Sequence, residues 1–167
     1  MKRYLLLVAI TFSFMLAQAQ WSKTYLLDDF GDTTDTYRIE GHSFDGLTHY
    51  NDPNAEPLEK FCIQITIDEN NNVGFLLYEN CTFTNNPYPG TNIFKGGTFR
   101  MRNSEGITEK VNIIGKLSKR GGLKLESDKF REFMSKSSGK VRCILKVGVA
   151  YYKFTLNATG YNEIVGN

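Results

Sequence analysis

Apolar and polar residues alternate with a period of two along most of the chain, which is the pattern of half-buried β-strands. The stretch 61–67 alternates in this way, and after the polar loop 68–72 the stretch 73–77 continues in the same phase. Pairing Ile67 with Val73 brings the two apolar faces together. This region therefore predicts a β-hairpin in that register.

The second half of the chain predicts further strands of the same kind. Residues 96–117 indicate a hairpin that turns at 104–106, residues 121–127 a short strand, and residues 140–158 a hairpin that turns near Gly148. The side chains expected to face inward share the apolar phase of these strands: Phe99, Met101, Val141, Cys143, Leu145, Val147, Tyr152, Phe154 and Leu156.

One segment has the period of an amphipathic helix. Residues 127–136 begin with Ser127 or Asp128 as an expected N-cap, and Gly139 follows the expected end. Its apolar residues stand at positions i, i+3 and i+4: Phe130, Phe133 and Met134. Eight or nine strands with this one short helix predict a mainly β fold, a single antiparallel β-sandwich.

The first 19 residues have the pattern of a secretory signal peptide: a basic start, an apolar stretch too short to span a membrane, and an Ala-x-Ala site. We expect cleavage after Ala19, which leaves residues 20–167 as one β-sandwich domain. Its first residue, Gln20, is then expected to cyclise. No second long apolar stretch follows, so the protein is expected to be exported, periplasmic or secreted, without a membrane span.

Charge is divided unevenly between the two halves of the expected mature chain. Residues 20–90 hold twelve acidic and three basic side chains, whereas residues 91–167 hold fifteen basic and six acidic ones. The halves therefore carry −9 and +9. Such an asymmetry indicates a charged partner surface, unless the halves lie side by side and neutralise each other.

Three cysteines, Cys62, Cys81 and Cys143, allow at most one disulfide. If the hairpin alternation continues beyond Asn80, Cys62 and Cys81 lie on opposite faces of the sheet and cannot bond. The geometry would allow a Cys81–Cys143 bond. Three free thiols are the favoured alternative, because free cysteine packs as a small apolar side chain.

An acidic cluster stands between two apolar segments near the N-terminus: Asp28, Asp29, Asp32 and Asp35, with Gly31 among them. The spacing does not match a calcium-binding loop of the EF-hand type. Aspartate and glycine are also the residues that tight turns require. We interpret the segment as a structural turn with no metal, and its four carboxylates are kept as weak metal candidates.

No pattern of catalytic residues stands out. His42 and His49 lack further ligands at metal-binding spacing, and no nucleophile motif or phosphate-binding loop occurs. We therefore expect a protein that is not an enzyme and has no cofactor. A hydrolase that uses the carboxylates of the Asp28–Asp35 turn is the alternative.

Basic side chains gather at the outward positions of the late strands, next to one aromatic residue: Arg100, Arg102, Lys140, Arg142, Lys146, Lys153 and Tyr151. Such a face suits an anionic glycan or a phosphate group. A solvated face whose lysines discourage edge pairing is the alternative. Tyr88, between two prolines in the loop 80–92, is a second binding candidate. Nucleic acid is not expected for an exported chain of net charge zero.

Two segments resemble known exported proteins. The N-terminal motif resembles one common in small exported Gram-negative β-sandwich proteins of unknown function: Trp21, Asp28, Asp29, Phe30, Gly31, Asp32 and Tyr37. The segments "SDKFREFMSKSSGKVRCIL" and "YYKFTLNATGYNEI" resemble the ending of invasion-associated locus B proteins. The resemblance implies a periplasmic or secreted β-sandwich with no recognised catalytic residues.

Taken together, the sequence predicts an exported, non-catalytic binding module for an anionic surface polymer or an envelope protein. Two alternatives stay open. The chain could be a structural envelope protein without a small ligand. It could also be a carboxylate-dependent hydrolase or calcium-binding module that uses the Asp28–Asp35 turn.

Overall fold

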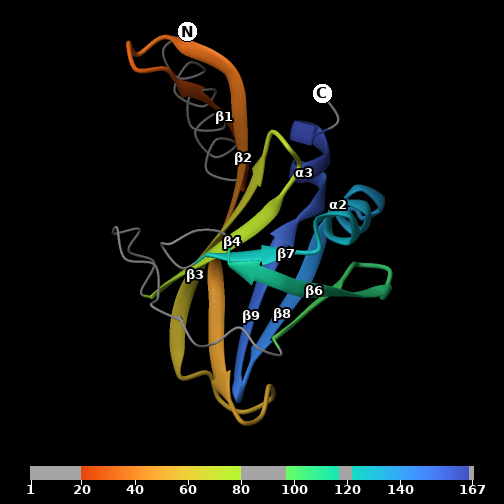
Figure 1. Ribbon diagram of the computed structural model, residues 1–167. Coiled ribbons are helices and arrows are strands. Elements are labelled where there is room, and N and C mark those ends of the chain that lie inside the picture. Colours follow the sequence, from red (N-terminus) through yellow and green to blue (C-terminus); the bar gives the residue numbers. More distant parts are fainter. Residues whose placement is uncertain (1–19, 80–96, 117–121, 166–167) are drawn as a thin grey trace, which may run out of the picture.

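The computed structural model describes residues 20–79, 97–116 and 122–165 (Figure 1). These residues form strands and helices in the order β1 (Trp21–Leu27), β2 (Thr33–Tyr50), β3 (Glu59–Asp68), β4 (Val73–Glu79), β5 (Thr98–Arg102), β6 (Thr108–Lys116), β7 (Leu123–Leu125), α2 (Ser127–Lys136), β8 (Lys140–Val147), β9 (Ala150–Asn157) and α3 (Ala158–Val165). The expected signal peptide and Tyr88 lie outside the described residues. Within them, no helix is long and apolar enough to cross a membrane.

The strands form one antiparallel sheet in the order β1-β2-β3-β4-β7-β6-β5-β8-β9, and β9 also pairs with β2. Eight strands therefore close into a barrel, and β1 pairs with β2 outside the ring. The mainly β prediction is confirmed, but the sandwich is corrected to a barrel. Closure depends on the pairing of Leu47 with Lys153 and of Tyr50 with Ala150, and no local sequence pattern indicates such a distant contact.

The long strand β2 makes this closure possible. One of its edges pairs with β3, while the partner of its other edge changes part-way along. Its first half pairs with β1, with Trp21 opposite Gly41, and its last residues pair with β9. The β1–β2 hairpin consequently extends beyond the barrel at the top of Figure 1. The β2–β3 register shifts between Ser43 and Gly46. At Gly46 a Cβ atom would lie 2.6 Å from the Phe61 ring, so the position has no room for a side chain.

Side chains complete the seam where β2 and β9 separate. Asp45 Oδ1 accepts a hydrogen bond from the backbone N–H of Thr155 at 3.1 Å. The Gln20 amide donates to the Thr155 carbonyl at 2.8 Å and accepts from the N–H of Asn157. The indole N–H of Trp21 donates to the Asn157 carbonyl at 2.8 Å. Polar backbone groups of β9 thus find partners beyond the last strand pairing.

The hairpin registers predicted from the alternation are confirmed. Ile67 lies opposite Val73 and Ile63 opposite Leu77. The hairpins β5–β6 and β8–β9 form as expected, and Gly148 takes a φ of 58° at the turn between β8 and β9. The side chains expected to face inward on β5, β8 and β9 are all buried.

The predicted helix is confirmed as α2, with Phe130, Phe133 and Met134 buried. Its N-cap differs, because Glu126 holds that position without a side-chain cap. The Ser127 hydroxyl instead accepts a hydrogen bond from the Val73 N–H at 2.9 Å, which ties the start of the helix to β4.

A second helix, α3, follows β9 directly and was not expected. It covers eight residues, and its first turn, Ala158-Thr159-Gly160, lacks an apolar period. Its stability comes from packing, because the buried Tyr161 ring contacts Trp21 at 5.1 Å and Phe130 at 6.5 Å between ring centroids. Short helices depend on such tertiary contacts, so local sequence is a weak guide to them.

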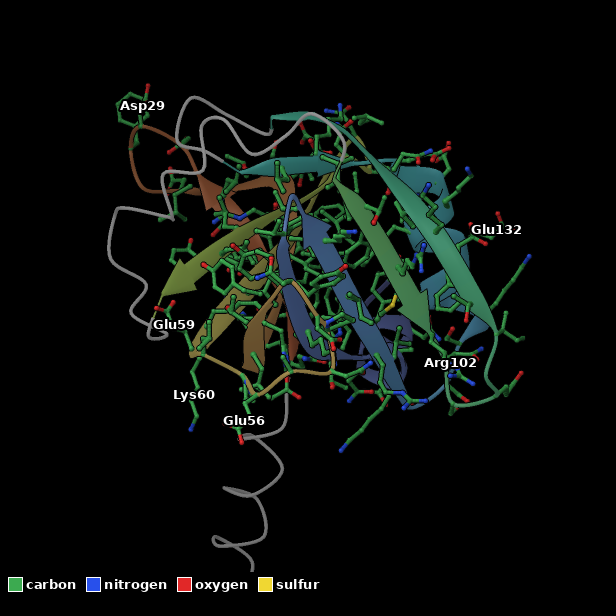
Figure 2. The ribbon with its side chains drawn as sticks, turned by 90° about the horizontal axis from the view of Figure 1, so that it is seen from below. Asp29, Glu56, Glu59, Lys60, Arg102 and Glu132 are labelled. Atoms are coloured by element: carbon green, nitrogen blue, oxygen red, sulfur yellow. The ribbon has the colours of Figure 1, made fainter. Side chains whose placement is uncertain are left out.

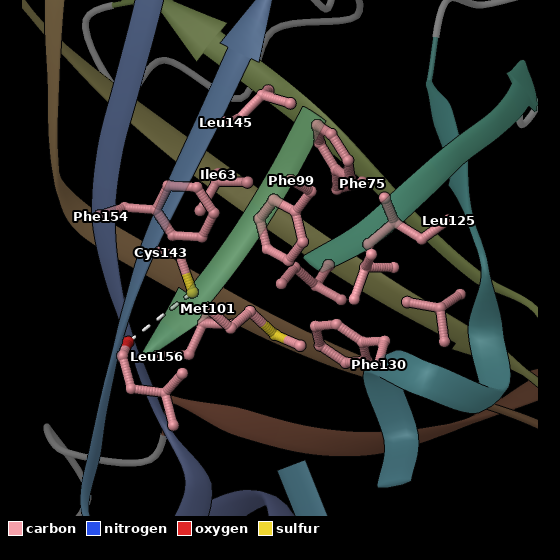
Figure 3. Close-up of a cluster of buried hydrophobic side chains, with 14 of the residues drawn as sticks. Ile63, Phe75, Phe99, Met101, Leu125, Phe130, Cys143, Leu145, Phe154 and Leu156 are labelled. Carbon is pink, nitrogen blue, oxygen red and sulfur yellow. Dashed lines mark hydrogen bonds between the residues drawn. The ribbon is translucent and has the colours of Figure 1, made fainter. Parts of the chain in front are cut away.

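Aromatic rings fill the centre of the barrel (Figure 3). The Phe99 ring lies 6.0 Å from Phe75, 5.9 Å from Phe154 and 6.3 Å from Phe130 of α2. All four side chains are at most 3% exposed. Burying each of them contributes about 1.5–3 kcal/mol, so this cluster joins the barrel wall to the helix.

The cysteines differ from the expectation. Cys62 is disulfide-bonded, and Cys143 is a free, buried thiol. The expectations of three free thiols and of a permitted Cys81–Cys143 bond are therefore wrong. The register itself holds, with Cys62 opposite Tyr78. Cys81, the chain's other cysteine, lies outside the described residues.

Candidate anion-binding site

A groove of about 570 Å³ runs across the outer wall of the barrel from the start of β6 over β5, β8 and β9 to β2. Four of the sequence-predicted binding residues line it: Arg100, Arg102, Arg142 and Lys153. Figure 2 shows Arg102 at the end of β5, beside the blue β8–β9 hairpin. The structure therefore brings together basic side chains that are up to 53 positions apart in the chain.

Strand pairing arranges the outward side chains of the groove in two rows. The first, which we call the polar row, crosses from β6 to β2: Thr108 lies opposite Arg102, Arg102 opposite Arg142, and Arg142 opposite Thr155. Asp45 ends this row, because it accepts a hydrogen bond from the Thr155 N–H.

The second row, which we call the mixed row, is offset from the first by two residues on each of the four strands β5, β8, β9 and β2. Arg100 lies opposite Ile144, Ile144 opposite Lys153, and Lys153 opposite Leu47. Apolar and cationic side chains thus alternate across β5, β8, β9 and β2. Both rows take part in the lining of the groove.

Among the described residues, no ion pair neutralises the positive charge of the groove. Within the described part of the chain, the three ion pairs lie elsewhere: Arg38–Glu40, Lys129–Glu126 and Lys136–Glu132. Like charges directly opposite each other on neighbouring strands destabilise a sheet. The Arg102–Arg142 pair is therefore an unfavourable arrangement that a bound anion would relieve.

The other sequence-predicted residues lie outside this groove. Lys146 and Tyr151 are opposite each other further along the same hairpin, with the Lys146 Nζ 5.1 Å from the Tyr151 ring centroid. Lys140 lies opposite Asn157, at the far end of β8. Tyr88 is outside the described residues. Only part of the basic face that the sequence predicted therefore lines the groove.

Sequence reasoning missed the uncharged and acidic members of the groove. Ile144 and Thr155 could have been found, because strand alternation places them outward with Arg142 and Lys153. Thr108 could have been found from the β5–β6 hairpin. Leu47 and Asp45 could not, since their position depends on barrel closure between β2 and β9.

Of the acidic cluster near the N-terminus, Asp28, Asp29 and Asp32 lie in the turn between β1 and β2, and Asp35 lies on β2. Asp28 Oδ1 accepts hydrogen bonds from the N–H groups of Phe30 and Asp32, both at 2.9 Å. Gly31 supplies the left-handed conformation, with φ of 88°. This is an Asx-type turn, in which a carboxylate binds nearby backbone. Among the described residues, no three His, Cys, Asp or Glu side chains group as a metal site would require.

Three further side chains that could be reactive, His42, His49 and Cys143, are each affected by burial or by a nearby backbone group. Burial lowers the pKa of His42, against an opposing effect of the Glu40 charge. The Nδ1 of His49 lies 2.8 Å from the Ala55 carbonyl oxygen. Burial, and then the charge of Asp45, raise the pKa of the Cys143 thiol well above its usual value, which disfavours the nucleophilic thiolate.

Comparison with protein-family models, with curated proteins and with solved structures found no match. The two resemblances noted in the sequence stay predictions. What the groove can bind therefore has to follow from its own geometry and charge.

Proposed function

We propose that this chain is an exported, non-catalytic binding protein whose ligand is an anionic polymer of the cell surface. The observation that carries the proposal is the groove over β5, β8 and β9, in which Arg100, Arg102, Arg142 and Lys153 meet without ion-pair partners in the described part of the chain.

The chemistry of these cations favours oxyanions. An arginine guanidinium presents a rigid fork of N–H donors that matches a carboxylate or phosphate through two parallel hydrogen bonds. Arg102 and Arg142 stand side by side on neighbouring strands, at a separation of about 5 Å that strand pairing imposes. One anionic group can therefore receive hydrogen bonds from both.

The length of the groove favours a polymer over a single ion. The polar row crosses five strands from Thr108 on β6 to Asp45 on β2. With neighbouring strands about 4.8 Å apart, it spans about 19 Å. Several units of an extended chain fit along such a row, and each exposed ionic contact adds a modest contribution.

Among its described lining residues, the groove offers one carboxylate rather than a catalytic pair. Asp45 is the one carboxylate among its described lining residues, and its Oδ1 is occupied by the Ser43 hydroxyl and the Thr155 N–H. Glycoside hydrolysis generally needs two carboxylates that flank the scissile bond. These observations support a binding role rather than hydrolysis.

Affinity chromatography on immobilised polysaccharides tests the proposal. We expect the protein, expressed from residue 20, to be retained on a polyuronate column and released by salt, and to pass through a neutral dextran column. Equal retention on both columns, or retention on neither, would overturn the proposal.

A further inference from the structure

Asp45 gives the basic groove a negative end. It lies at the register shift of β2, where its Oδ1 accepts hydrogen bonds from the Ser43 hydroxyl at 2.5 Å and from the Thr155 N–H at 3.1 Å. Its side chain lines the groove and is exposed. The polar row therefore runs from two adjacent arginines to a carboxylate, with Thr155 between them.

This polarity matters for the kind of anion that fits. A polymer with a charge on every unit would place one of its anionic groups beside Asp45, where two like charges repel each other. A polymer in which acidic units alternate with neutral, hydroxyl-bearing units could place a hydroxyl there. That hydroxyl would donate a charge-assisted hydrogen bond to the carboxylate.

The rest of the lining agrees with a sugar chain. The Thr155 hydroxyl can donate to or accept from a sugar hydroxyl. Ile144 and Leu47 offer apolar surface in the mixed row, which suits the C–H groups on the face of a sugar ring. A phosphate chain offers neither hydroxyl donors nor an apolar face.

Building on the proposed function, we propose that Asp45 is a specificity-determining residue, and that the groove selects acidic polysaccharides whose charged units are interrupted by neutral ones. Arg102 and Arg142 hold the acidic unit, and the carboxylate of Asp45 accepts a hydrogen bond from a hydroxyl of the neutral unit. Uniformly charged polyanions bind less well because one of their charges meets Asp45.

The test compares the wild-type protein with Asp45→Asn against two probes, by isothermal titration calorimetry at fixed salt. One probe is hyaluronan oligosaccharide, in which a uronic acid alternates with a neutral amino sugar. The other is polygalacturonate of similar length, in which every unit is acidic.

Asparagine keeps an Oδ1 acceptor for the Thr155 N–H, so the seam is retained, and equal melting temperatures check this. Asp35→Asn, an exposed carboxylate of β2 that does not line the groove, is the matched control.

We expect Asp45→Asn to weaken hyaluronan binding and to strengthen polygalacturonate binding, each by about threefold to tenfold, which corresponds to the loss of one hydrogen bond or one repulsion. Asp35→Asn should change neither. If Asp45→Asn strengthens both probes alike, Asp45 only repels anions and the selectivity is wrong, while the proposed function stands. If the wild-type protein binds neither probe, the proposed function and this inference both fail.

Discussion

Arg102 and Arg142 lie directly opposite each other on β5 and β8, and both side chains are exposed on the outer wall of the barrel. Neither forms an ion pair in the described part of the chain. A cross-strand pair of like charges lowers stability. Both arginines line the groove, so the proposed binding function gives this unfavourable pair a reason to be there.

Arg142→Gln should therefore stabilise the unliganded protein. We expect the free energy of unfolding to rise by about 0.2–1 kcal/mol at low salt, and the gain to shrink as salt screens the repulsion. Urea denaturation at two salt concentrations measures this, with Lys140→Gln as the control outside the groove. A loss of stability at low salt would mean that Arg142 has a favourable partner.

Gln20 should stay uncyclised in the folded protein if cleavage follows Ala19, contrary to the expectation from sequence. Cyclisation joins the α-amino nitrogen to the side-chain amide carbon and expels Nε2 as ammonia. In the structure, that amide bonds to the backbone of Thr155 and Asn157. Intact-mass analysis of freshly exported protein should show the mass of residues 20–167 without loss of ammonia. Complete loss of ammonia in the folded protein would contradict the seam.

Alkaline pH should destabilise the protein. Burial raises the pKa of Tyr161, and burial followed by the charge of Asp45 raises that of Cys143. The folded state then keeps protons that the unfolded state releases, so the free energy of unfolding falls as pH rises. Full stability is expected below about pH 8.5, with a decline that steepens above about pH 10. Tyr161→Phe should make the decline shallower in urea titrations; an unchanged profile would remove Tyr161 as a cause.

Reduction should weaken the fold by breaking the disulfide that holds Cys62, and it should leave Cys143 unchanged because that thiol is already free. A non-reducing peptide map is expected to show Cys62 in a disulfide and Cys143 free. Removing the disulfide should lower the free energy of unfolding by about 2–4 kcal/mol. Thiol labelling of the oxidised protein should modify Cys143 only after denaturant is added, because its side chain is 1% exposed. A free Cys62 in the native protein would contradict the structure.

Local patterns were enough for much of this fold. Period-two alternation placed Ile63 opposite Leu77, and the i, i+3, i+4 spacing defined α2. Contacts between distant segments were not accessible in this way. Barrel closure between β2 and β9 and the docking of Tyr161 in α3 both depend on tertiary packing, which local propensity does not determine.

The same distinction between local pattern and distant contact applies to the candidate site. Arg100, Arg102, Arg142 and Lys153 were identified because alternation within each hairpin turns them outward. Their convergence in one groove depends on the β5–β8 pairing, which joins strands distant in sequence. Asp45 reaches the groove only because β2 closes the barrel against β9. The sequence therefore could not predict that the basic groove has a negative end.

The most direct test of anion binding at this groove is the affinity for acidic polysaccharide of two double variants that each lose two positive charges. Arg102→Gln/Arg142→Gln removes the positive charge at the centre of the groove. Lys140→Gln/Lys146→Gln removes two positive charges from the same barrel face outside the groove. Titration calorimetry with hyaluronan oligosaccharide at fixed salt should show a loss of about tenfold or more for the arginine pair, from about 1.5 kcal/mol or more of charge-assisted hydrogen bonding. The lysine pair should change the affinity at most twofold. Equal losses in the two variants would contradict a specific site and leave only general attraction to a basic surface.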